Sequence, residues 1–325
     1  MPFWKKDLQI LKKNGFHSMR KLQAWISACR LRTLPLSISG AIIGSGVAYS
    51  EGVFNLSVFV YTILTTLSFQ ILSNLANDYG DGVKGTDNEN RIGPERALQS
   101  GIISPKQMRN AIIINVIICL FLVVTLIYQA FGADQFLTSF IFIVLGVLAI
   151  IAAIKYTVGT SAYGYKALGD IMVFLFFGWL SVLGTYFLYS KQIDFLMLLP
   201  ASAVGLLSAG VLNLNNMRDF ESDKGSHKHT LAGYLGLKNA RNYHLTLILT
   251  AMVLMLLYFG LSTQNLPILI IMIGFIPLFI HLSVFYKVQS PKDYDPQLKV
   301  LALSTFLLAL IFGASHMLIL NYIII

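Results

Sequence analysis

Two short segments of the sequence carry acidic and amide side chains at spacings that suit metal binding. The first reads NLANDYGDGVKGTD (residues 74–87) and contains Asn77, Asp78, Asp81 and Asp87. If a helix continues through this segment, Asn77 and Asp81 lie four residues apart and share one face. Three glycines follow Tyr79 within the segment and allow the chain to turn, so that Asp87 folds back toward the same point.

The second segment reads NLNNMRDFESDK (residues 213–224). It spaces Asn215, Asp219 and Asp223 at i, i+4 and i+8, which predicts a single stripe of oxygen ligands along one helix face. Oxygen ligands without His or Cys favour a hard cation, and Mg²⁺ usually binds one or two carboxylates together with substrate phosphates.

Basic residues lie close to both acidic segments and are partners for a polyanion. They are Lys84, Arg91, Arg96, Arg218, Lys224 and Lys228. Clustered carboxylates raise one another's pKa values unless a positive charge lies among them. A single charged loop is usually only a solvated surface, but two matching Asn/Asp stripes are poorly explained in that way. We therefore predict a site for a magnesium-bound diphosphate, with Mg²⁺ as the cofactor.

The composition shows which elements must position this site. Of the 325 residues, 56% are hydrophobic and 12% are charged, and the mean hydropathy is +0.69, whereas soluble domains average about 25% charged residues. We expect an all-α polytopic membrane protein with nine transmembrane helices. The predicted spans are 34–50, 56–76, 110–131, 135–154, 170–189, 195–217, 241–261, 266–286 and 300–323. Each has about the length that a bilayer core requires.

The basic residues are distributed unequally between the two predicted faces. The N-terminal segment and the even-numbered loops carry 23 of the 24 Lys and Arg, and the other face keeps only Lys191. The positive-inside rule then predicts a cytoplasmic N-terminus. Residues 1–33 are expected to form an interfacial segment on the lipid bilayer, and residues 34–325 a single transmembrane domain. This topology accounts for the net charge of +9 without a nucleic-acid partner, and it leaves the oligomeric state unknown.

Both acidic segments fall in long loops, 77–109 and 218–240, on the predicted cytoplasmic face. These loops hold eight of the 15 acidic residues, so function is expected there. The segments follow the second and sixth predicted spans. This offset of four spans predicts two related four-helix halves with a ninth helix appended.

At these residues the sequence resembles the UbiA superfamily of intramembrane aromatic prenyltransferases, and within it the MenA branch, which acts on 1,4-dihydroxy-2-naphthoate. The first motif is NDYGDGVKGTD followed by RIGPERALQSG, and the second is NNMRDFESDK. Further similarity lies in CRLRTLP (29–35) and KYTVGTSAYGYKALGDIMVFLFFG (155–178). The resemblance begins at about residue 24 and continues to the ninth predicted span.

The resemblance carries residue roles onto this sequence. Asn77, Asp81 and Asp87 match the first metal-binding set, and Asp219 and Asp223 match the second. Basic positions near the diphosphate or the cavity mouth are matched by Arg30, Arg96, Lys155, Arg218 and Lys228. The loop after the second motif departs from the family, because Ser226 and His227 precede Lys228 and Tyr234 stands where a basic residue is common.

The resemblance implies Mg²⁺-dependent transfer of a polyprenyl group from polyprenyl diphosphate to 1,4-dihydroxy-2-naphthoate. Carbon dioxide and diphosphate would be lost, and demethylmenaquinone would form for menaquinone biosynthesis. The enzyme would lie in a prokaryotic inner membrane with its active site facing the cytoplasm. Prenyl transfer breaks an allylic C–O bond, so the positive charge on the allyl fragment must be stabilised and kept from water.

We assign catalytic roles to Asp170, Lys155 and Tyr156, and a cation-stabilising pocket to Tyr163, Tyr165 and Phe177. Asp170 is the candidate proton acceptor, since an ionisable group at a span is a functional candidate by default. Other roles stay open for these residues. The tyrosines would also suit an interfacial aromatic belt, Phe177 plain packing, and Asp170 a helix cap. His281 and His316 are interpreted as neutral, hydrogen-bonded helix residues.

Three alternatives remain at this stage. An ion-coupled transporter also has charged groups within a helix bundle, but it places them near the midplane, whereas these charges cluster at one face. A CDP-alcohol phosphotransferase is also Asp-rich, but its Asp-Gly and Ala-Arg signature is absent from the sequence. Within the UbiA superfamily, another aromatic acceptor remains possible.

Overall fold

The structure is a computed structural model that describes residues 19–87, 91–226, 228–262 and 265–323. Over these ranges the fold is helical and forms no β-strand beyond one isolated bridge between Lys166 and His229. The long helices are α2 (Leu34–Ser50), α3 (Leu56–Lys84), α4 (Pro105–Phe131), α5 (Phe136–Lys155), α7 (Ser181–Ser190), α8 (Leu198–Arg218), α10 (Leu231–Leu261), α11 (Asn265–Phe285) and α12 (Tyr294–Ile323). The short ones are α6 (Gly169–Val173), α9 (Phe220–Gly225), the 3₁₀ turns η1 (Leu31–Thr33), η2 (Tyr163–Tyr165), η4 (Phe195–Met197) and η5 (Pro291–Asp293), and the π-helical η3 (Phe174–Leu180).

These helices confirm an all-α integral membrane protein. In the described part of the chain, eight helical stretches are long and apolar enough to cross a bilayer, and Leu269–Phe285 within α11 is a shorter apolar helix. The count of nine spans and the cytoplasmic N-terminus stay predictions. Of the expected interfacial segment, residues 1–18 lie outside the described residues, and residues 19–29 are helical.

Several helices extend beyond the apolar runs that predict them. Helix α2 coincides with the span expected at 34–50, but α3 continues from the expected end at residue 76 to Lys84. Helix α10 begins at Leu231 instead of residue 241, with a kink at Gly236, whose φ of 73° and ψ of 155° are not helical. Hydropathy marks only the lipid-facing length, whereas backbone hydrogen bonding carries a helix on into its polar end. Helix α3 stops at Gly85, which has a φ of 73° and is a left-handed C-terminal cap that glycine adopts without strain.

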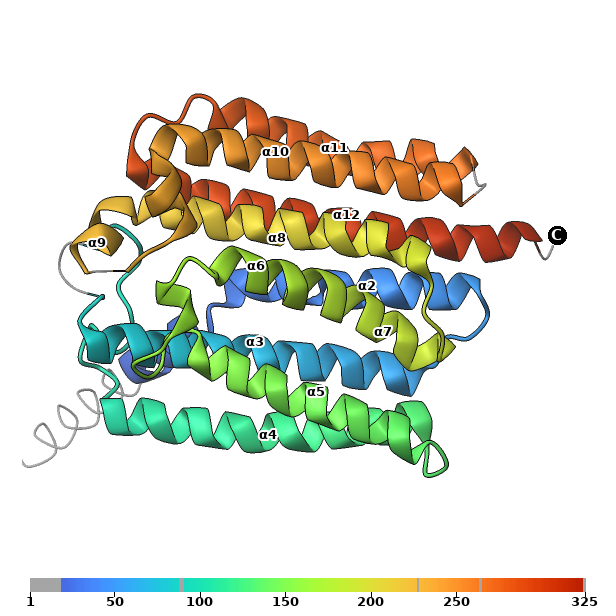
Figure 1. Ribbon diagram of the computed structural model, residues 1–325, viewed down its shortest axis with the longest axis horizontal. Helices are drawn as coiled ribbons and strands as arrows, with labels where there is room; N and C mark the ends of the chain where they lie inside the picture. The colour runs from blue at the N-terminus through green and yellow to red at the C-terminus, as the bar shows by residue number, and fades with distance from the viewer. Residues whose placement is uncertain (1–18, 88–90, 227, 263–264, 324–325) are drawn as a thin grey trace, which may run out of the picture.

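The helices lie side by side, and the C-terminal ends of α3 and α8 lie at one end of the molecule (Figure 1). The C-terminal end of α3, the loop after it and α9 lie at that end, and α12 finishes at the opposite end. Helix α2 packs against α7 and α12, and α8 packs against α10 and η3. The two acidic segments therefore share one end of the bundle, as their matching positions after α3 and α8 require.

The π-helical segment η3 packs closely against α8. Helices α6 and α7 are joined by the π-helical stretch η3, which forms one continuous helix with them and packs on α8. A Cβ on Gly178 would lie 2.5 Å from the carbonyl oxygen of Ala201. Only glycine therefore allows η3 to approach α8 this closely. Single π turns inside α-helices frequently occur at functional sites.

The buried histidines belong to the opposite half of the bundle from α3 and α4. The Nε2 atoms of His244 and His281 are 2.9 Å apart, and Nδ1 of His281 is 2.9 Å from Oε1 of Gln297. His316 Nε2 lies 3.1 Å from the hydroxyl of Tyr258. These hydrogen bonds link α10, α11 and α12, in agreement with the interpretation of His281 and His316 as hydrogen-bonded helix residues.

Candidate active site

The last two turns of α3 present the first acidic segment. Asn77 and Asp81 both line an internal cavity, as expected for residues four apart on one helix face. Thr157, just after α5, fixes this part of α3 by donating hydrogen bonds to the carbonyl oxygen of Ala76 at 3.0 Å and to Oδ1 of Asn77 at 3.2 Å. A Cβ at Gly80 would lie 2.5 Å from Oγ1 of Thr157, so the glycine makes the contact possible.

The two other acids of this segment have different surroundings. Asp78 is buried and accepts hydrogen bonds from the backbone N–H groups of Ala97 and Leu98, both at 3.2 Å. Its carboxylate therefore fastens the loop after α3. Asp78 is not among the residues that line the cavity, and its role as a metal ligand stays a prediction. Asp87 is also buried and pairs with Arg91.

Asp81 is held in place by an aromatic hydroxyl. Tyr165 donates a hydrogen bond to Oδ1 of Asp81 at 2.7 Å, and its hydroxyl oxygen is 2.6 Å from Oγ1 of Thr86. The Nζ atoms of Lys84 and Lys228 lie 4.1 and 5.9 Å from the centroid of the same ring. Tyr165 is not among the cavity-lining residues, and its predicted cation-stabilising role stays a prediction.

The second acidic segment keeps its helical spacing, but only part of it lines the cavity. Helix α8 ends at Arg218 and α9 begins at Phe220, with Asp219 between them at φ −93° and ψ 12°. The backbone hydrogen bonds of the helix continue across this residue, from the N–H of Asp219 to the carbonyl oxygen of Asn215 at 3.0 Å and from the N–H of Asp223 to the carbonyl oxygen of Asp219 at 2.8 Å. Asn215 and Asp219 line the cavity, whereas Asp223 pairs with Lys228, whose Nζ lies 3.4 Å from its Oδ1.

Arg91 connects the two segments. Its guanidinium pairs with Asp87, and its Nη2 lies 3.8 Å from Oδ2 of Asp219. The side chain of Arg91 is 8% exposed and that of Asp219 is 4% exposed, so solvent screens the contact weakly. The tips of α3 and α8 are thus close enough for one guanidinium to contact acids from both.

Burial and neighbouring charges shift several pKa values outside the membrane spans. Burial raises the pKa of Asp223 to about 6, although Lys228 opposes the shift. Burial alone would also raise the pKa of Asp219, but the guanidinium of Arg218 holds it below its usual value. Burial alone would lower the pKa of Lys228, but Asp81 and Asp223 raise it above the ordinary lysine value. Lys228 is therefore a firmly charged cation between the two segments.

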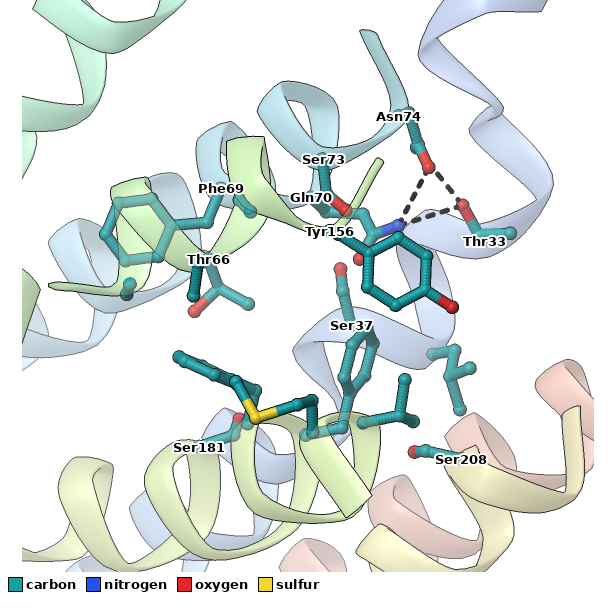
Figure 2. Close-up of a pocket in the computed structure, with 18 of the residues that line it drawn as sticks. Thr33, Ser37, Thr66, Phe69, Gln70, Ser73, Asn74, Tyr156, Ser181 and Ser208 are labelled. Atoms are coloured by element: carbon teal, nitrogen blue, oxygen red, sulfur yellow. Dashed lines mark hydrogen bonds between the residues drawn. The ribbon is translucent and has the colours of Figure 1, made fainter. Parts of the chain in front are cut away.

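The cavity runs from this charged mouth into the bundle and has a volume of about 390 Å³. Its inner wall is mostly apolar, formed by side chains of α4, α5, η3, α7 and α8. Representative lining residues are Val123, Leu126, Ile127, Phe142, Leu145, Phe176, Phe177, Leu180, Leu188 and Leu212. Figure 2 shows Tyr156 projecting into this space between side chains of α3 and Ser208 of α8. The cavity therefore suits a ligand with an anionic group, which the basic residues at the mouth would bind, and a long apolar chain, which the inner wall would contact.

The predicted cations fall into two groups. Arg30, Arg91, Arg96 and Lys228 line the cavity. Lys84 and Lys224 are exposed and are not among the lining residues, and Arg218 is fully buried behind Asp219. Arg32 and Lys299 also line the cavity and were missed, since neither stands near an acidic segment in the sequence.

The predicted catalytic and aromatic residues are likewise divided. Tyr156, Tyr163 and Phe177 line the cavity. Lys155 is exposed at the end of α5 and does not line it. Asp170 is buried, lies outside the lining set, and accepts a hydrogen bond from the hydroxyl of Tyr243 at 3.5 Å. The N-cap residue of α6 is Leu168, and no side-chain hydrogen bond caps this helix, so Asp170 is not its N-cap.

A polar group on the cavity wall was missed entirely. Gln70 donates to Oδ1 of Asn74 at 3.1 Å and to Oγ1 of Thr33 at 3.4 Å, and Asn74 donates to the carbonyl oxygen of Cys29 at 2.9 Å. The cavity is lined here by Gln70, Ser73 and Asn74 of α3 and by Thr33 of η1 (Figure 2). The available signal was the spacing of Gln70, Asn74 and Asn77 on one face of α3.

The oxygen ligands fit a hard cation that is completed by a substrate. Among residues 19–87, 91–226, 228–262 and 265–323, no three His, Cys, Asp or Glu side chains gather closely enough to hold a metal ion. Two buried carboxylate oxygens, Oδ2 of Asp87 and Oδ2 of Asp223, accept no hydrogen bond in the described structure. A set of separate carboxylates with free oxygens suits Mg²⁺, which takes few protein ligands and relies on phosphates and water for the rest.

The helix bundle and this site define an intramembrane prenyltransferase, and the chain belongs to the UbiA prenyltransferase family, whose model matches residues 37–311. The chain is 44% identical over 247 residues to 1,4-dihydroxy-2-naphthoate octaprenyltransferase of Escherichia coli (strain K12), covering 76% of this chain and 79% of that protein. It is 40% identical over 297 residues to the protein of the same name from Haemophilus influenzae, covering 90% and 95%. The family membership removes the transporter and the CDP-alcohol phosphotransferase from consideration.

The fold is also similar to that of a UbiA homologue from Archaeoglobus fulgidus bound to GPP and Mg²⁺. The TM-score is 0.62 at 17% sequence identity, and the match covers 90% of this chain and 99% of that one. The arrangement of helices is therefore that of the UbiA fold.

Proposed function

We propose that this protein transfers a polyprenyl group from polyprenyl diphosphate to 1,4-dihydroxy-2-naphthoate. The observation that carries the proposal is that Asp81 and Asp219, from two distant acidic segments, line one cavity with a cationic mouth and an apolar interior. The relatives at 44% and 40% identity supply the acceptor, since both are named for 1,4-dihydroxy-2-naphthoate.

Asn77, Asp81, Asp87, Asp219 and Asp223 are the residues that would hold Mg²⁺, with Asn215 beside them. Magnesium bound at this position supplies positive charge that stabilises a departing diphosphate. Support comes from the oxygen-only donor set and from two buried carboxylate oxygens that accept no hydrogen bond, Oδ2 of Asp223 and Oδ2 of Asp87, the latter 3.9 Å from Nε of Arg96. The solved Archaeoglobus fulgidus homologue is named as a complex with GPP and Mg²⁺, which agrees with this assignment.

The cations at the mouth bind and orient the diphosphate. Arg30, Arg91, Arg96 and Lys228 line the cavity, and guanidinium groups form strong, directional hydrogen bonds to phosphate oxygens. As the allylic C–O bond breaks, negative charge collects on the leaving diphosphate. These cations then interact more strongly with the transition state than with the intact substrate, and this difference lowers the barrier.

The apolar depth of the cavity accommodates the prenyl tail and excludes water from the allyl cation. Tyr156, Tyr163 and Phe177 line the same space, and each aromatic face stabilises a nearby cation by about 0.5 to 2 kcal/mol. Burial raises the pKa of Tyr156 to about 12, so its phenol stays protonated and adds no charge of its own.

The acceptor ring forms a carbon–carbon bond with the allyl cation and loses its carboxylate as carbon dioxide. No oxidant takes part, so the ring keeps both hydroxyl groups and the immediate product is the quinol form of demethylmenaquinone. The quinone expected from the sequence requires a separate oxidation. The breaking C–CO₂ bond leaves its electron pair on the ring, so the net reaction releases no proton. A base is required if the prenyl group joins the neighbouring ring carbon, whose proton must then move to the carbon that loses carbon dioxide. Asp170 is our candidate for this proton transfer; a Cβ on its neighbour Gly169 would lie 2.9 Å from the hydroxyl of Tyr156, so the start of α6 lies close to a cavity-lining residue.

The charge distribution supports a cytoplasmic active site in a prokaryotic inner membrane. Basic residues concentrate at the end of the bundle that holds the mouth, and the relatives at 44% and 40% identity come from bacteria. Positive charge at one membrane face predicts that this face is cytoplasmic.

The test is the mass of the product formed by the purified protein in lipid vesicles with geranyl or octaprenyl diphosphate, Mg²⁺ and 1,4-dihydroxy-2-naphthoate. The expected mass is that of the neutral acceptor plus the prenyl group, minus carbon dioxide and one hydrogen. A parallel reaction with 4-hydroxybenzoate tests the alternative acceptor. Product from 4-hydroxybenzoate alone would overturn the proposed acceptor and retain the enzyme class.

A further inference from the structure

Arg218 contacts two carboxylates that come from different parts of the chain. On one side its Nε lies 2.9 Å from Oδ1 of Asp219 and its Nη2 lies 2.7 Å from Oδ2 of the same carboxylate. On the other side its Nη1 donates to Asp295, the second residue of α12. Nη2 also donates to Oδ1 of Asn215 at 2.9 Å. The guanidinium thus bridges Asp219, at the end of α8, and the first turn of α12.

Arg218 is fully buried and is not among the residues that line the cavity. Protein oxygens accept hydrogen bonds from all three of its nitrogens. The guanidinium is therefore placed to orient the Asp219 carboxylate and not to contact a diphosphate. This differs from the role in diphosphate binding that the sequence predicts for Arg218.

Asp295 balances the charge of this arrangement. A buried guanidinium next to a metal ligand competes with the metal for the same carboxylate, and an uncompensated buried charge is costly. Asp295 supplies the second negative charge, so Asp219 does not have to neutralise Arg218 alone. Arg32 contacts the other side of Asp295 at 3.3 Å, but both of these side chains are about one-third exposed, and such a pair contributes little.

We propose that Asp295 is a positioning residue for the metal site: by holding Arg218, it keeps the Asp219 carboxylate oriented toward the cavity and available to a divalent cation. The inference rests on the proposed function, because it assumes that Asp219 binds metal. Mutation of a residue that holds a metal ligand in place commonly lowers metal affinity or activity by about 10- to 100-fold. We expect a loss of metal affinity of about that size when the Asp295 carboxylate is removed.

The test measures Mn²⁺ binding by electron paramagnetic resonance in the full-length protein with geranyl diphosphate, alongside the half-saturating Mg²⁺ concentration for activity. Asp295→Asn should weaken Mn²⁺ binding by about 10- to 100-fold and raise the half-saturating Mg²⁺ concentration in parallel. Asp295→Glu, which keeps the charge, should restore most of the affinity. Asp293→Asn is the matched control, because it removes a charge two residues away that contacts the backbone of Ser290 and not Arg218.

A second comparison separates positioning from a general effect on folding. In an Arg218→Gln background, Asp295→Asn should lower the Mn²⁺ affinity by less than about a further twofold, since the two residues act through one contact. Wild-type Mn²⁺ affinity in a folded Asp295→Asn protein, or fully additive effects in the double variant, would overturn the inference while leaving the proposed function intact. A wild-type protein that binds no Mn²⁺ would overturn the metal assignment and this inference together.

Discussion

The guanidinium of Arg91 bridges Asp87, which follows α3, and Asp219, which follows α8, with 3.8 Å between its Nη2 and Oδ2 of Asp219. One cation therefore stands between carboxylates that are 132 positions apart in the sequence. When a diphosphate and a divalent cation enter, Arg91 can exchange these carboxylates for phosphate oxygens, which are equally good acceptors for a guanidinium.

Arg91→Gln should lower kcat/KM by about 10- to 100-fold, because a hydrogen bond to a charged group contributes about 1.5 to 3 kcal/mol. Steady-state kinetics with variable prenyl diphosphate measure the effect. Arg109→Gln is the control, since Arg109 is an exposed basic residue on α4 that does not line the cavity. Equal kinetics for Arg91→Gln and wild type would remove Arg91 from the site.

Asp81→Asn and Asp219→Asn should each reduce kcat by two orders of magnitude or more, on the order of the loss seen when one group that stabilises a transition state is removed. Turnover of membranes containing equal amounts of folded protein measures this. Glu221→Gln changes an exposed acid of the same region and should retain activity. Near-normal turnover in either aspartate variant would contradict its assignment as a metal ligand.

Lys228→Ala should mainly raise the KM for the prenyl diphosphate, because Lys228 lines the cavity and lies between Asp81 and Asp223. Lys224→Ala is the matched control; it removes an exposed lysine of the same loop that is outside the cavity lining. If both variants kept the wild-type KM, Lys228 would not contact the substrate.

Removing divalent cations should abolish product formation. Treatment of the reconstituted protein with EDTA, followed by dialysis, is expected to leave no product above background, and added Mg²⁺ should restore the original rate. Transfer that continues at full rate in the chelator would argue against a metal-held diphosphate.

Asp170→Asn tests the candidate proton acceptor. If the carboxylate takes the proton from the ring, kcat should fall by about 10²- to 10⁴-fold with little change in the KM for either substrate. Tyr243→Phe removes only the hydrogen bond at 3.5 Å and should have a much smaller effect. Similar small losses in both variants would assign Asp170 a structural role.

The sequence predicts the membrane class and most helix positions well, because lipid solvation requires long apolar runs that are visible without coordinates. The pairing of Asn77 with Asp81 also follows from helical periodicity alone. The pairing of Asp223 with Lys228 outside the cavity lining could not be foreseen, since helical spacing alone groups Asp223 with Asn215 and Asp219. The contact between Arg218 and Asp295 joins positions 77 residues apart, and no local spacing records such a tertiary contact.

The directions of the helices around the mouth have an electrostatic consequence that involves no side chain. Helices α3 and α8 both end there, and the first turn of α2 begins there, with Thr33 and Leu36 lining the cavity. Aligned peptide dipoles place about half a negative charge at the C-terminal end of a helix and about half a positive charge at the N-terminal end. The backbone itself therefore divides the mouth into a sector that attracts cations, beside α3 and α8, and one that attracts anions, beside α2.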